Sequence, residues 1–227
     1  MRLAVIVPVL NEADGIGRML AVLQTMRARG VRLVVVDGGS ADDTADQARP
    51  FADELVFAER GRARQLNAGA QHVAAAADVL LFLHADTRLP ADADRLIGET
   101  IARGARWGRF DVRIDGSAAL LRIVSALMNW RSRLTGICTG DQAIFVERAL
   151  FETLGGFPDQ PLMEDIEFSR SARHIAWPAA LSGAITSGRR WERRGVWPTI
   201  RQMWSLRWRY WRGADPATLA REYQEVR

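Results

Sequence analysis

The sequence contains no lysine, so all 31 of its basic residues are arginines, and it has only two tyrosines. Little therefore titrates between neutral pH and the very high pKa of the guanidinium group. Against 27 acidic residues, the formal net charge is only +4. The basic character of the chain is for this reason a weak argument for nucleic-acid binding.

Cysteine and histidine are also scarce. The single cysteine, Cys138, excludes a disulfide bond within the chain and any zinc site built from several cysteines. The three histidines are widely separated in the sequence and predict no metal-binding cluster. No apolar run approaches the roughly 20 residues that span a bilayer. The first residues lead directly into an apolar strand, without the regions of a signal peptide, and we expect a cytoplasmic protein.

Apolar residues are abundant by contrast, at 48% of the chain beside 26% charged residues, as in an ordinary globular protein. Short apolar runs alternate with segments of helical periodicity. The predicted strands are 3–9, 33–36, 54–58 and 79–83, and the predicted helices are 13–26, from 44 onward, 61–77 and 91–103. This alternation predicts an α/β fold with a mainly parallel sheet flanked by helices.

The pattern changes after Gly104. Residues 109–114 alternate in polarity like a half-exposed strand, and residues 118–128 form an apolar helix. A short strand at 143–145, a helical turn at 148–154 and a helix over 162–172 follow. Because no repeat, low-complexity linker or boundary interrupts the chain, we predict one domain over residues 1–227.

Polar side chains stand where three of the predicted strands end. Asn11 and Glu12 follow the first strand, Asp37 the second and Asp86 the fourth. The carboxyl ends of parallel strands share one edge of the sheet, and open α/β sheets bind their ligands there. An acidic residue at this edge can hold a divalent cation, which in turn holds a phosphate. Local roles are the alternative, since Asp86 can cap the next helix and Asp-Gly-Gly is a common turn sequence.

Three common phosphate-binding patterns are absent at this edge. A dinucleotide site requires G-x-G-x-x-G after the first strand, where this chain reads PVLNE. A P-loop is absent as well. A phosphatase with an aspartate nucleophile would need a second aspartate soon after Asp37, where Gly38 and Gly39 stand. The main competing nucleotide and phosphate enzymes are therefore excluded.

Four segments, in order along the chain, resemble the motifs of family 2 glycosyltransferases. They are residues 7–12 (VPVLNE), 36–44 (VDGGSADDT), 84–86 (HAD) and 164–165 (ED). The resemblance covers residues 3–172 and implies an inverting, nucleotide-sugar-dependent enzyme with the GT-A fold. Residues 140–142 (GDQ), 162–165 (LMED) and 187–191 (SGRRW) resemble more narrowly a small bacterial subgroup, some members of which are named arsenosugar-biosynthesis glycosyltransferases.

The resemblance implies a division of the chain into a nucleotide-binding half (1–103), an acceptor and catalytic half (104–187) and a helical extension (188–227). It also assigns residues to the donor. Those that it implies for nucleotide or donor binding are Pro8, Asn11, Glu12, Asp37, Arg64, Asn67, Asp86 and Arg190. Asp37 would recognise the nucleobase, and Arg64 and Asn67 lie at a helix start, where N–H groups and arginine suit anions. Those that it implies for the acceptor side or its support are Asp141, Gln142, Glu164 and Trp191.

By the same resemblance, Asp86 binds Mg²⁺ or Mn²⁺, which neutralises the leaving diphosphate. The first aspartate of the family's D-x-D-like motif is replaced here by His84. His84 is therefore open to three roles, as a metal ligand, as support for one, or as a structural residue.

Asp165 is the candidate general base. It would take the proton from the acceptor hydroxyl as that oxygen attacks the anomeric carbon of the sugar. An inverting displacement needs this one carboxylate and no covalent sugar intermediate. The alternative is that Glu164, Asp165 and Glu167 only favour a helix N-terminus through its dipole.

The last third of the chain is rich in arginine and tryptophan. Trp197, Trp204, Trp208 and Trp211 share one narrow face of a predicted helix. We expect this stripe to pack on the domain or on a second subunit of a homodimer. The second interpretation is a peripheral helix on the inner face of the cell membrane, since tryptophan and arginine suit the headgroup region. Nucleic-acid binding is the weakest of the three interpretations, and we expect no such partner.

The sequence thus predicts transfer of a sugar from a nucleotide donor to a hydroxyl acceptor, either a small molecule or a lipid-linked one. A nucleotidyltransferase on a related fold is one alternative, but it predicts a glycine-rich, lysine-bearing loop that is missing. The other alternative is a non-catalytic module that binds a nucleotide sugar or a membrane.

Overall fold

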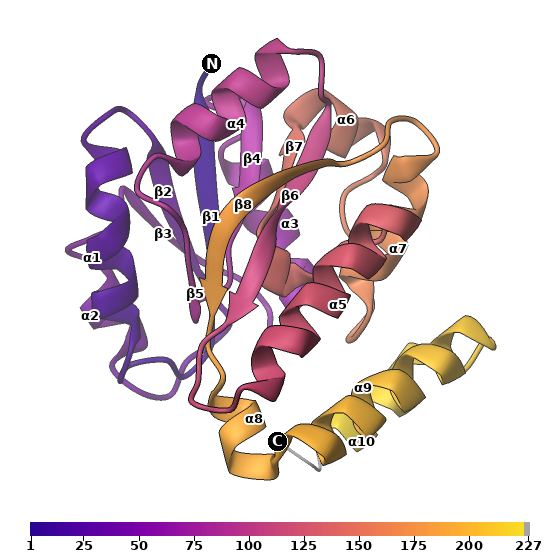
Figure 1. The fold of residues 1–227 in the computed structure, drawn as a ribbon. Helices are drawn as coiled ribbons and strands as arrows, with labels where there is room; N and C mark the ends of the chain where they lie inside the picture. Colours follow the sequence, from indigo (N-terminus) through magenta and orange to yellow (C-terminus); the bar gives the residue numbers. More distant parts are fainter. Residues whose placement is uncertain (225–227) are drawn as a thin grey trace.

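The computed structural model describes residues 1–224. Its centre is an eight-stranded sheet in the order β3-β2-β1-β4-β7-β6-β8-β5 (Figure 1). The strands are β1 (Leu3–Val9), β2 (Arg32–Asp37), β3 (Glu54–Phe57), β4 (Val79–Phe82), β5 (Thr87–Arg88), β6 (Trp107–Ile114), β7 (Ile144–Glu147) and β8 (Ala179–Thr186). This one sheet contains strands from both predicted halves of the chain, and the boundaries at residues 103 and 187 stay predictions.

Helices cover both faces of the sheet. They are α1 (Ile16–Arg27), α2 (Thr44–Ala48), α3 (Arg62–His72), α4 (Ala93–Ala102), α5 (Leu120–Thr135), α6 (Arg148–Thr153), α7 (Glu164–Arg173), α8 (Arg189–Arg194), α9 (Val196–Trp211) and α10 (Pro216–Gln224), with a 3₁₀ turn η1 (Gly140–Gln142). Along β1, Val5 and Val7 point to the core under α1 and α4, whereas Ala4 and Ile6 point to the core under α3, α6 and α7. Successive side chains of β1 thus pack into two separate cores, one on each face of the sheet, as expected of a strand buried on both faces.

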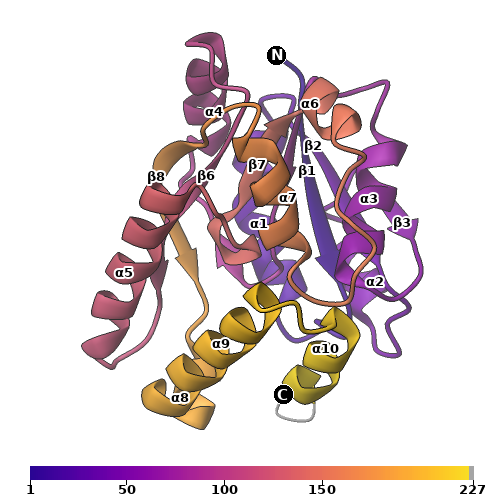
Figure 2. The ribbon, with the colours of Figure 1, turned by 90° about the vertical axis from the view of Figure 1, so that its right-hand side faces the viewer.

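The predicted parallel alternation in the first half is confirmed. Strands β3, β2, β1 and β4 are all parallel, and β1 pairs with β2 through Val9 and Asp37. This register brings the ends of β1, β2 and β4 to one edge of the sheet. In Figures 1 and 2, β1 runs from the N-terminus toward helices α8 to α10, which therefore lie beneath that edge.

The second half departs from the parallel pattern. Strand β7 is antiparallel to both β4 and β6, and β8 returns parallel to β6. The predicted strand over residues 109–114 is confirmed as part of β6, where Asp111 and Arg113 are the more exposed positions, but Arg109 departs from the expected alternation because it is buried. The polar residue Arg109 is only 1% exposed, and its guanidinium contacts Asp111, the Ser132 hydroxyl and the Asn129 carbonyl. The guanidinium of Arg109 is therefore directed toward helix α5 and not toward the solvent.

Several helix boundaries also differ from the predictions. The helix predicted to continue to residue 77 ends at His72, and α5 continues to Thr135 rather than ending at 128. The sequence did not predict four further elements, namely strands β5 and β8 and helices α8 and α10.

The expected packing of the tryptophan stripe on its own domain is wrong. Trp197, Trp204, Trp208 and Trp211 on α9 are 67%, 73%, 58% and 74% exposed. Helix α9 instead buries Thr199 and Leu206. Within residues 1–224, no helix has the length and hydrophobicity needed to cross a membrane.

Candidate active site

The ends of β1 and β2 are tied together by side chains. The backbone N–H of Asn11 donates to the Ser40 hydroxyl at 3.0 Å, and the Asn11 side-chain oxygen accepts from Ala41 N–H at 2.8 Å. The Glu12 N–H donates to the Thr44 hydroxyl at 2.7 Å. Asn11 has a φ of 53°, so the chain turns sharply after Pro8 and the rest of β1. These bonds shape a loop at the carboxyl edge of the sheet.

Asp37 is buried at this edge, with only 1% of its surface exposed. One carboxylate oxygen accepts the backbone N–H groups of Gly39 and Ser40, both at 2.7 Å. The other, Oδ2, is buried without a hydrogen-bond partner among the described residues. A buried oxygen in this state is costly unless a ligand donates to it.

Gln65 on α3 is a site residue that the sequence did not identify. Its amide nitrogen donates to the carbonyls of Val9 and Val36, at 2.8 and 2.9 Å, and so joins the two strand ends. A hypothetical Cβ on Gly38 would lie 2.8 Å from the Gln65 side chain, which explains the glycine after Asp37. No motif in the sequence signals such a contact between a helix and two carbonyls.

The two predicted residues on α3 lie in structural contacts. Arg64 pairs with Asp159 at 2.9 Å and with Glu59 at 2.8 Å. Asn67 bonds both the N–H and the carbonyl of Phe157. The α3 arginine that lines the pocket is Arg62, two residues before Arg64. A helix start with alternating arginines does not reveal which of them points inward.

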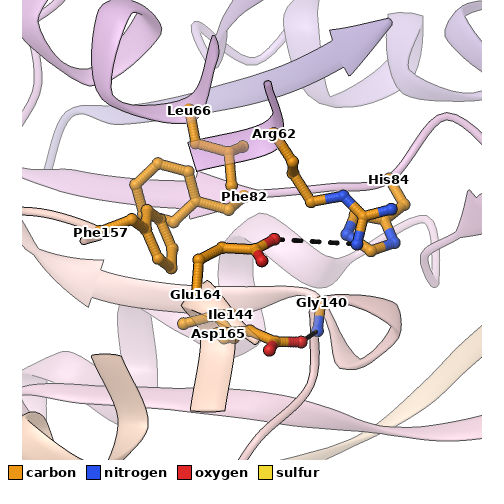
Figure 3. A pocket seen from close by; sticks show the side chains of 9 residues that line it. All are labelled: Arg62, Leu66, Phe82, His84, Gly140, Ile144, Phe157, Glu164 and Asp165. Carbon is orange, nitrogen blue, oxygen red and sulfur yellow. Dashed lines mark hydrogen bonds and ion pairs between the residues drawn. The ribbon is translucent and has the colours of Figure 1, made fainter. Parts of the chain in front are cut away.

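A pocket lies between α3, the end of β4, η1 and the start of α7 (Figure 3). Its lining residues are Arg62, Leu66, Phe82, His84, Gly140, Ile144, Phe157, Glu164 and Asp165. Glu164 is buried and lies 3.8 Å from the Arg62 guanidinium. Burial and repulsion from Asp165 raise the pKa of Glu164, although Arg62 opposes the shift.

Asp165 stands at the first turn of α7 beside this pocket. Its Oδ2 accepts the N–H of Gly140 at 2.8 Å, and its Oδ1 accepts the N–H of Ile166 at 2.7 Å. Both partners are backbone groups, so the carboxylate is oriented without an ion pair to an arginine among residues 1–224.

His84 lines the same pocket and contacts Asp141. His84 Nδ1 lies 3.1 Å from Asp141 Oδ1, and its other ring nitrogen packs directly against Gly140. Burial opposes ionisation of Asp141, but the His84 hydrogen bond and charge, with Arg62 and Arg190, lower its pKa to about 2. The ring thus holds Asp141 in place, and the role of His84 toward a metal stays a prediction.

Asp86 follows at the start of β5, with its side chain exposed. Its carbonyl accepts the N–H of Ser187, which joins the end of β4 to the segment before α8. Its carboxylate has no hydrogen bond or ion pair within the described chain. Residues 1–224 contain no cluster of three acidic, histidine or cysteine side chains suited to a metal. Metal binding by Asp86 stays a prediction.

The remaining predicted residues lie at the edges of the site. The Arg190 guanidinium lies 4.6 Å from the centre of the Tyr223 ring, and Trp191 packs in a small cluster with Ile114, Leu121 and Val124. Gln142 is fully buried and closes the η1 turn by bonding Thr139 and Asn129. Trp191 and Gln142 therefore contribute packing and turn geometry.

Solved structures of sugar-transferring enzymes share this fold. S. aureus TarS 1-349 in complex with UDP-GlcNAc has a TM-score of 0.65 at 18% identity, covering 82% of this chain and 58% of that one. The mannosyltransferase PcManGT from Pyrobaculum calidifontis, in complex with GDP-Man and Mn²⁺, has a TM-score of 0.63 at 23% identity, covering 91% and 60%. At these identities the likeness shows the fold alone, the GT-A fold.

A sequence relative and a family match extend the likeness. The succinoglycan biosynthesis protein ExoA of Rhizobium meliloti (strain 1021) is 30% identical over 109 residues, which are 44% of this chain and 33% of ExoA. The chain thus matches only a third of that relative's length. Residues 4–148 match the family described as Glycosyl transferase family 2, which is more than half of the chain. The narrower likeness to the arsenosugar subgroup stays a prediction. The protein belongs to glycosyl transferase family 2 and is a glycosyltransferase.

Proposed function

We propose that the protein transfers a sugar, with inversion at the anomeric carbon, from a nucleoside-diphosphate sugar to an acceptor hydroxyl, with Asp165 as the general base. The observation that carries this proposal is the way in which the Asp165 carboxylate is held. Its two oxygens accept backbone N–H groups at 2.8 and 2.7 Å, at the margin of the pocket. An oriented carboxylate without an arginine partner keeps lone pairs free for a proton.

In the proposed reaction, the acceptor oxygen loses its proton to Asp165 as it attacks the anomeric carbon. A new C–O bond forms while the bond from that carbon to the diphosphate breaks, and the diphosphate leaves with the electron pair. Gly140 and Ile166 hold the carboxylate in place during the step. A single positioned base of this kind typically contributes about 10²- to 10⁴-fold to the rate.

The donor side of the proposal rests on the loops after β1 and β2. Asp37 Oδ2 is buried and has no partner in the part of the chain that the structure describes, and an N–H group on a pyrimidine or purine edge would satisfy it. Pro8, Asn11 and Glu12 form the adjoining loop. The titles of two similar structures record UDP-GlcNAc and GDP-Man as their ligands, which supports a nucleotide-sugar donor without choosing the nucleotide.

Asp86 would hold Mg²⁺ or Mn²⁺ together with donor oxygens and water. When bound, the cation neutralises charge on the leaving diphosphate. Among this chain's own residues, Arg62 and Arg190 add positive charge on the His84 side, as their effect on Asp141 indicates. The structure of PcManGT contains Mn²⁺, in keeping with a divalent cation.

The test compares Asp165→Asn with Glu167→Gln, a matched control on the same helix turn whose carboxylate pairs with Arg170 and Tyr210. Release of nucleoside diphosphate from UDP- and GDP-sugars is measured with Mn²⁺, beside thermal-shift binding of UDP and GDP. Asp165→Asn should lower turnover by about 10²-fold or more and leave nucleotide binding intact. Equal turnover in Asp165→Asn and the wild type would overturn the proposed base. Nucleotide binding without turnover in the wild type would favour a non-catalytic module.

A second candidate function, attachment to a membrane surface, is favoured by exposed apolar side chains. Besides the four tryptophans of α9, helix α5 exposes Ile123, Leu127, Trp130 and Leu134 at helical spacing. A Trp204→Ala, Trp208→Ala variant should bind anionic vesicles less than the wild type in a sedimentation assay. Equal sedimentation would refute membrane attachment through α9. An increase in monomer would assign this face to a homodimer.

A further inference from the structure

Two arginines near Asp165 have no side-chain hydrogen bond or ion pair within residues 1–224. Arg131, on α5, has its Nε and Nη2 atoms buried without a hydrogen bond among residues 1–224. Arg207, on α9, is half-buried and forms no hydrogen bond or ion pair with the described residues either. A buried guanidinium has five N–H donors, and leaving them unmatched costs free energy.

Arg109 gives the contrast within the same molecule. Its guanidinium is also buried, but it contacts Asp111, the hydroxyl of Ser132 and the carbonyl of Asn129. Ser132 follows Arg131 directly on α5. Each of the three nitrogens of the Arg109 guanidinium thus has a partner, whereas Nε and Nη2 of Arg131 have none among residues 1–224. Buried N–H groups without a protein acceptor in the described chain, such as those of Arg131, are expected where a bound ligand supplies the acceptor.

Packing places Arg131 near the start of α7. Helix α5 is joined to α7 by Arg173, which donates to the Thr135 carbonyl at 2.7 Å. The Ser169 hydroxyl donates to the Asp165 carbonyl and accepts from Cys138 N–H, and the Cys138 thiol in turn contacts Ser132. This chain of contacts leads from Asp165 to the residue next to Arg131.

Packing places Arg207 on the other side of the same helix start. Leu206 is buried against Met163, the residue immediately before α7. One turn later on α9, the Tyr210 hydroxyl donates to Glu167 at 3.0 Å. Figure 2 shows α9 below α7 and α5 to its side. The two unpartnered arginines therefore flank the turn that carries Asp165.

The charges agree with this placement. Burial and repulsion from Arg207 lower the pKa of Arg131 to about 10, with Asp165 acting in the opposite direction. Burial lowers the pKa of Arg207, and Asp165 and Asp141 oppose the shift. Arg131 thus stays protonated at neutral pH. Two positive groups that repel each other are stabilised by an anion between them.

We propose that Arg131 and Arg207 form an anion subsite on the acceptor side of Asp165, and that the acceptor carries a phosphate group beside the hydroxyl that is glycosylated. This inference rests on the proposed function. Guanidinium groups bind phosphate through paired N–H donors, and a phosphate fixed by two of them would present a nearby hydroxyl to the Asp165 carboxylate. The donor diphosphate is assigned instead to the side of Asp86, Arg62 and Arg190.

The test measures binding of inorganic phosphate by calorimetry, at constant ionic strength and with saturating UDP or GDP, so that the diphosphate site is occupied. The variants are Arg131→Gln and Arg207→Gln, and the matched control is Arg122→Gln, an exposed arginine on α5 without a side-chain partner among the described residues. The wild type and the control should bind phosphate equally. Each of the other two variants should bind it at least about tenfold more weakly.

A second arm separates a free phosphate from a lipid headgroup. Vesicles of phosphatidylcholine with and without phosphatidic acid are tested with the same variants. Binding that depends on phosphatidic acid and on Arg131, in the absence of free-phosphate binding, assigns the subsite to a lipid-linked acceptor. If neither probe binds in a manner that depends on Arg131 and Arg207, the inference is wrong.

Nucleotide binding separates this inference from the proposed function. If Arg131→Gln weakens UDP or GDP binding as much as phosphate binding, the arginines hold the donor and the acceptor subsite is refuted. If the wild type binds neither UDP nor GDP, the proposed function fails, whatever the phosphate result. Thermal melts check folding, and Arg131→Gln should not be less stable than the wild type, since it removes an unpaired buried charge.

Discussion

Replacing Gly140 by alanine should disturb the candidate site through a single methyl group. A Cβ at Gly140 would lie 2.2 Å from His84 Nε2 and 2.4 Å from His84 Cε1, far inside van der Waals contact. To make room, the His84 ring or the η1 turn must move by about 1 Å or more. The ring cannot move freely, because it is buried and bonded to Asp141. The turn cannot move without stretching the Gly140 bond to Asp165.

Overpacking of this kind costs about 1–3 kcal/mol, and we expect Gly140→Ala to lower the free energy of unfolding by about 2 kcal/mol. For a chain of this size, that corresponds to a fall in Tm of about 4–8 °C. Urea denaturation of the variant and the wild type measures the difference. Gly15→Ala is the matched control, because a Cβ there meets nothing within 4 Å and the φ of −129° suits any residue. Its stability should change by no more than about 0.5 kcal/mol.

A double-mutant cycle with His84→Ala tests the cause. Truncating His84 removes the atoms that the new methyl group meets, so Gly140→Ala should cost clearly less in the His84→Ala background. If Gly140→Ala costs the same in both backgrounds, or costs less than about 0.5 kcal/mol in the wild type, the contact between His84 and Gly140 does not constrain the site.

Two further predictions concern charge and packing around the site. The pKa of Asp141 is about 2 in the folded state, below its ordinary value of 3.8, so its ionised form stabilises the fold above about pH 4 and loses that effect as the pH falls toward 2. Because the side chain is 47% exposed, solvent screening limits this effect to about 1 kcal/mol or less. The free energies of unfolding of Asp141→Asn and the wild type, measured by urea denaturation, should differ at pH 7 and converge near pH 2. Phe168→Ala should lower the free energy of unfolding by about 3–5 kcal/mol in urea denaturation. The centre of the Phe168 ring lies 4.8 Å from that of Phe157 and 6.0 Å from that of Trp107. A loss below about 1 kcal/mol would contradict that packing.

The nucleotide side of the fold could be predicted because its information is local. The apolar runs that became β1, β2 and β4 are continuous, and the polar residues directly after them mark the sheet edge where Asp37 and Asp86 stand. Strand β8 was not predicted for the opposite reason. It reads AALSGAIT, with small residues and a glycine, and it is held in place by β6, more than 60 residues earlier in the chain. Such long-range pairing leaves no periodic signal.

Side-chain direction was the second limit. The sequence identified an arginine at the start of α3 but not that Arg62 faces the pocket while Arg64 pairs with Asp159. It identified the tryptophan face of α9 correctly as a stripe, but not that the stripe points away from the domain. Both outcomes depend on how a helix is rotated against its neighbours, which the apolar pattern of a single helix does not determine when both faces carry large side chains.

The arginines around α7 show how the molecule separates positive charges that stabilise the fold from those available to a ligand. Asp111 takes part in holding Arg109, and Asp159 and Glu59 hold Arg64, so these arginines are neutralised by protein carboxylates. The carboxylate at the centre of the site, Asp165, is held by backbone N–H groups. Because Asp165 is oriented without an arginine, Arg131 keeps its unpaired donors close to a carboxylate that stays available for proton transfer. An ion pair between them would occupy both groups, whereas their separation keeps a base and a binding site for negative charge next to each other.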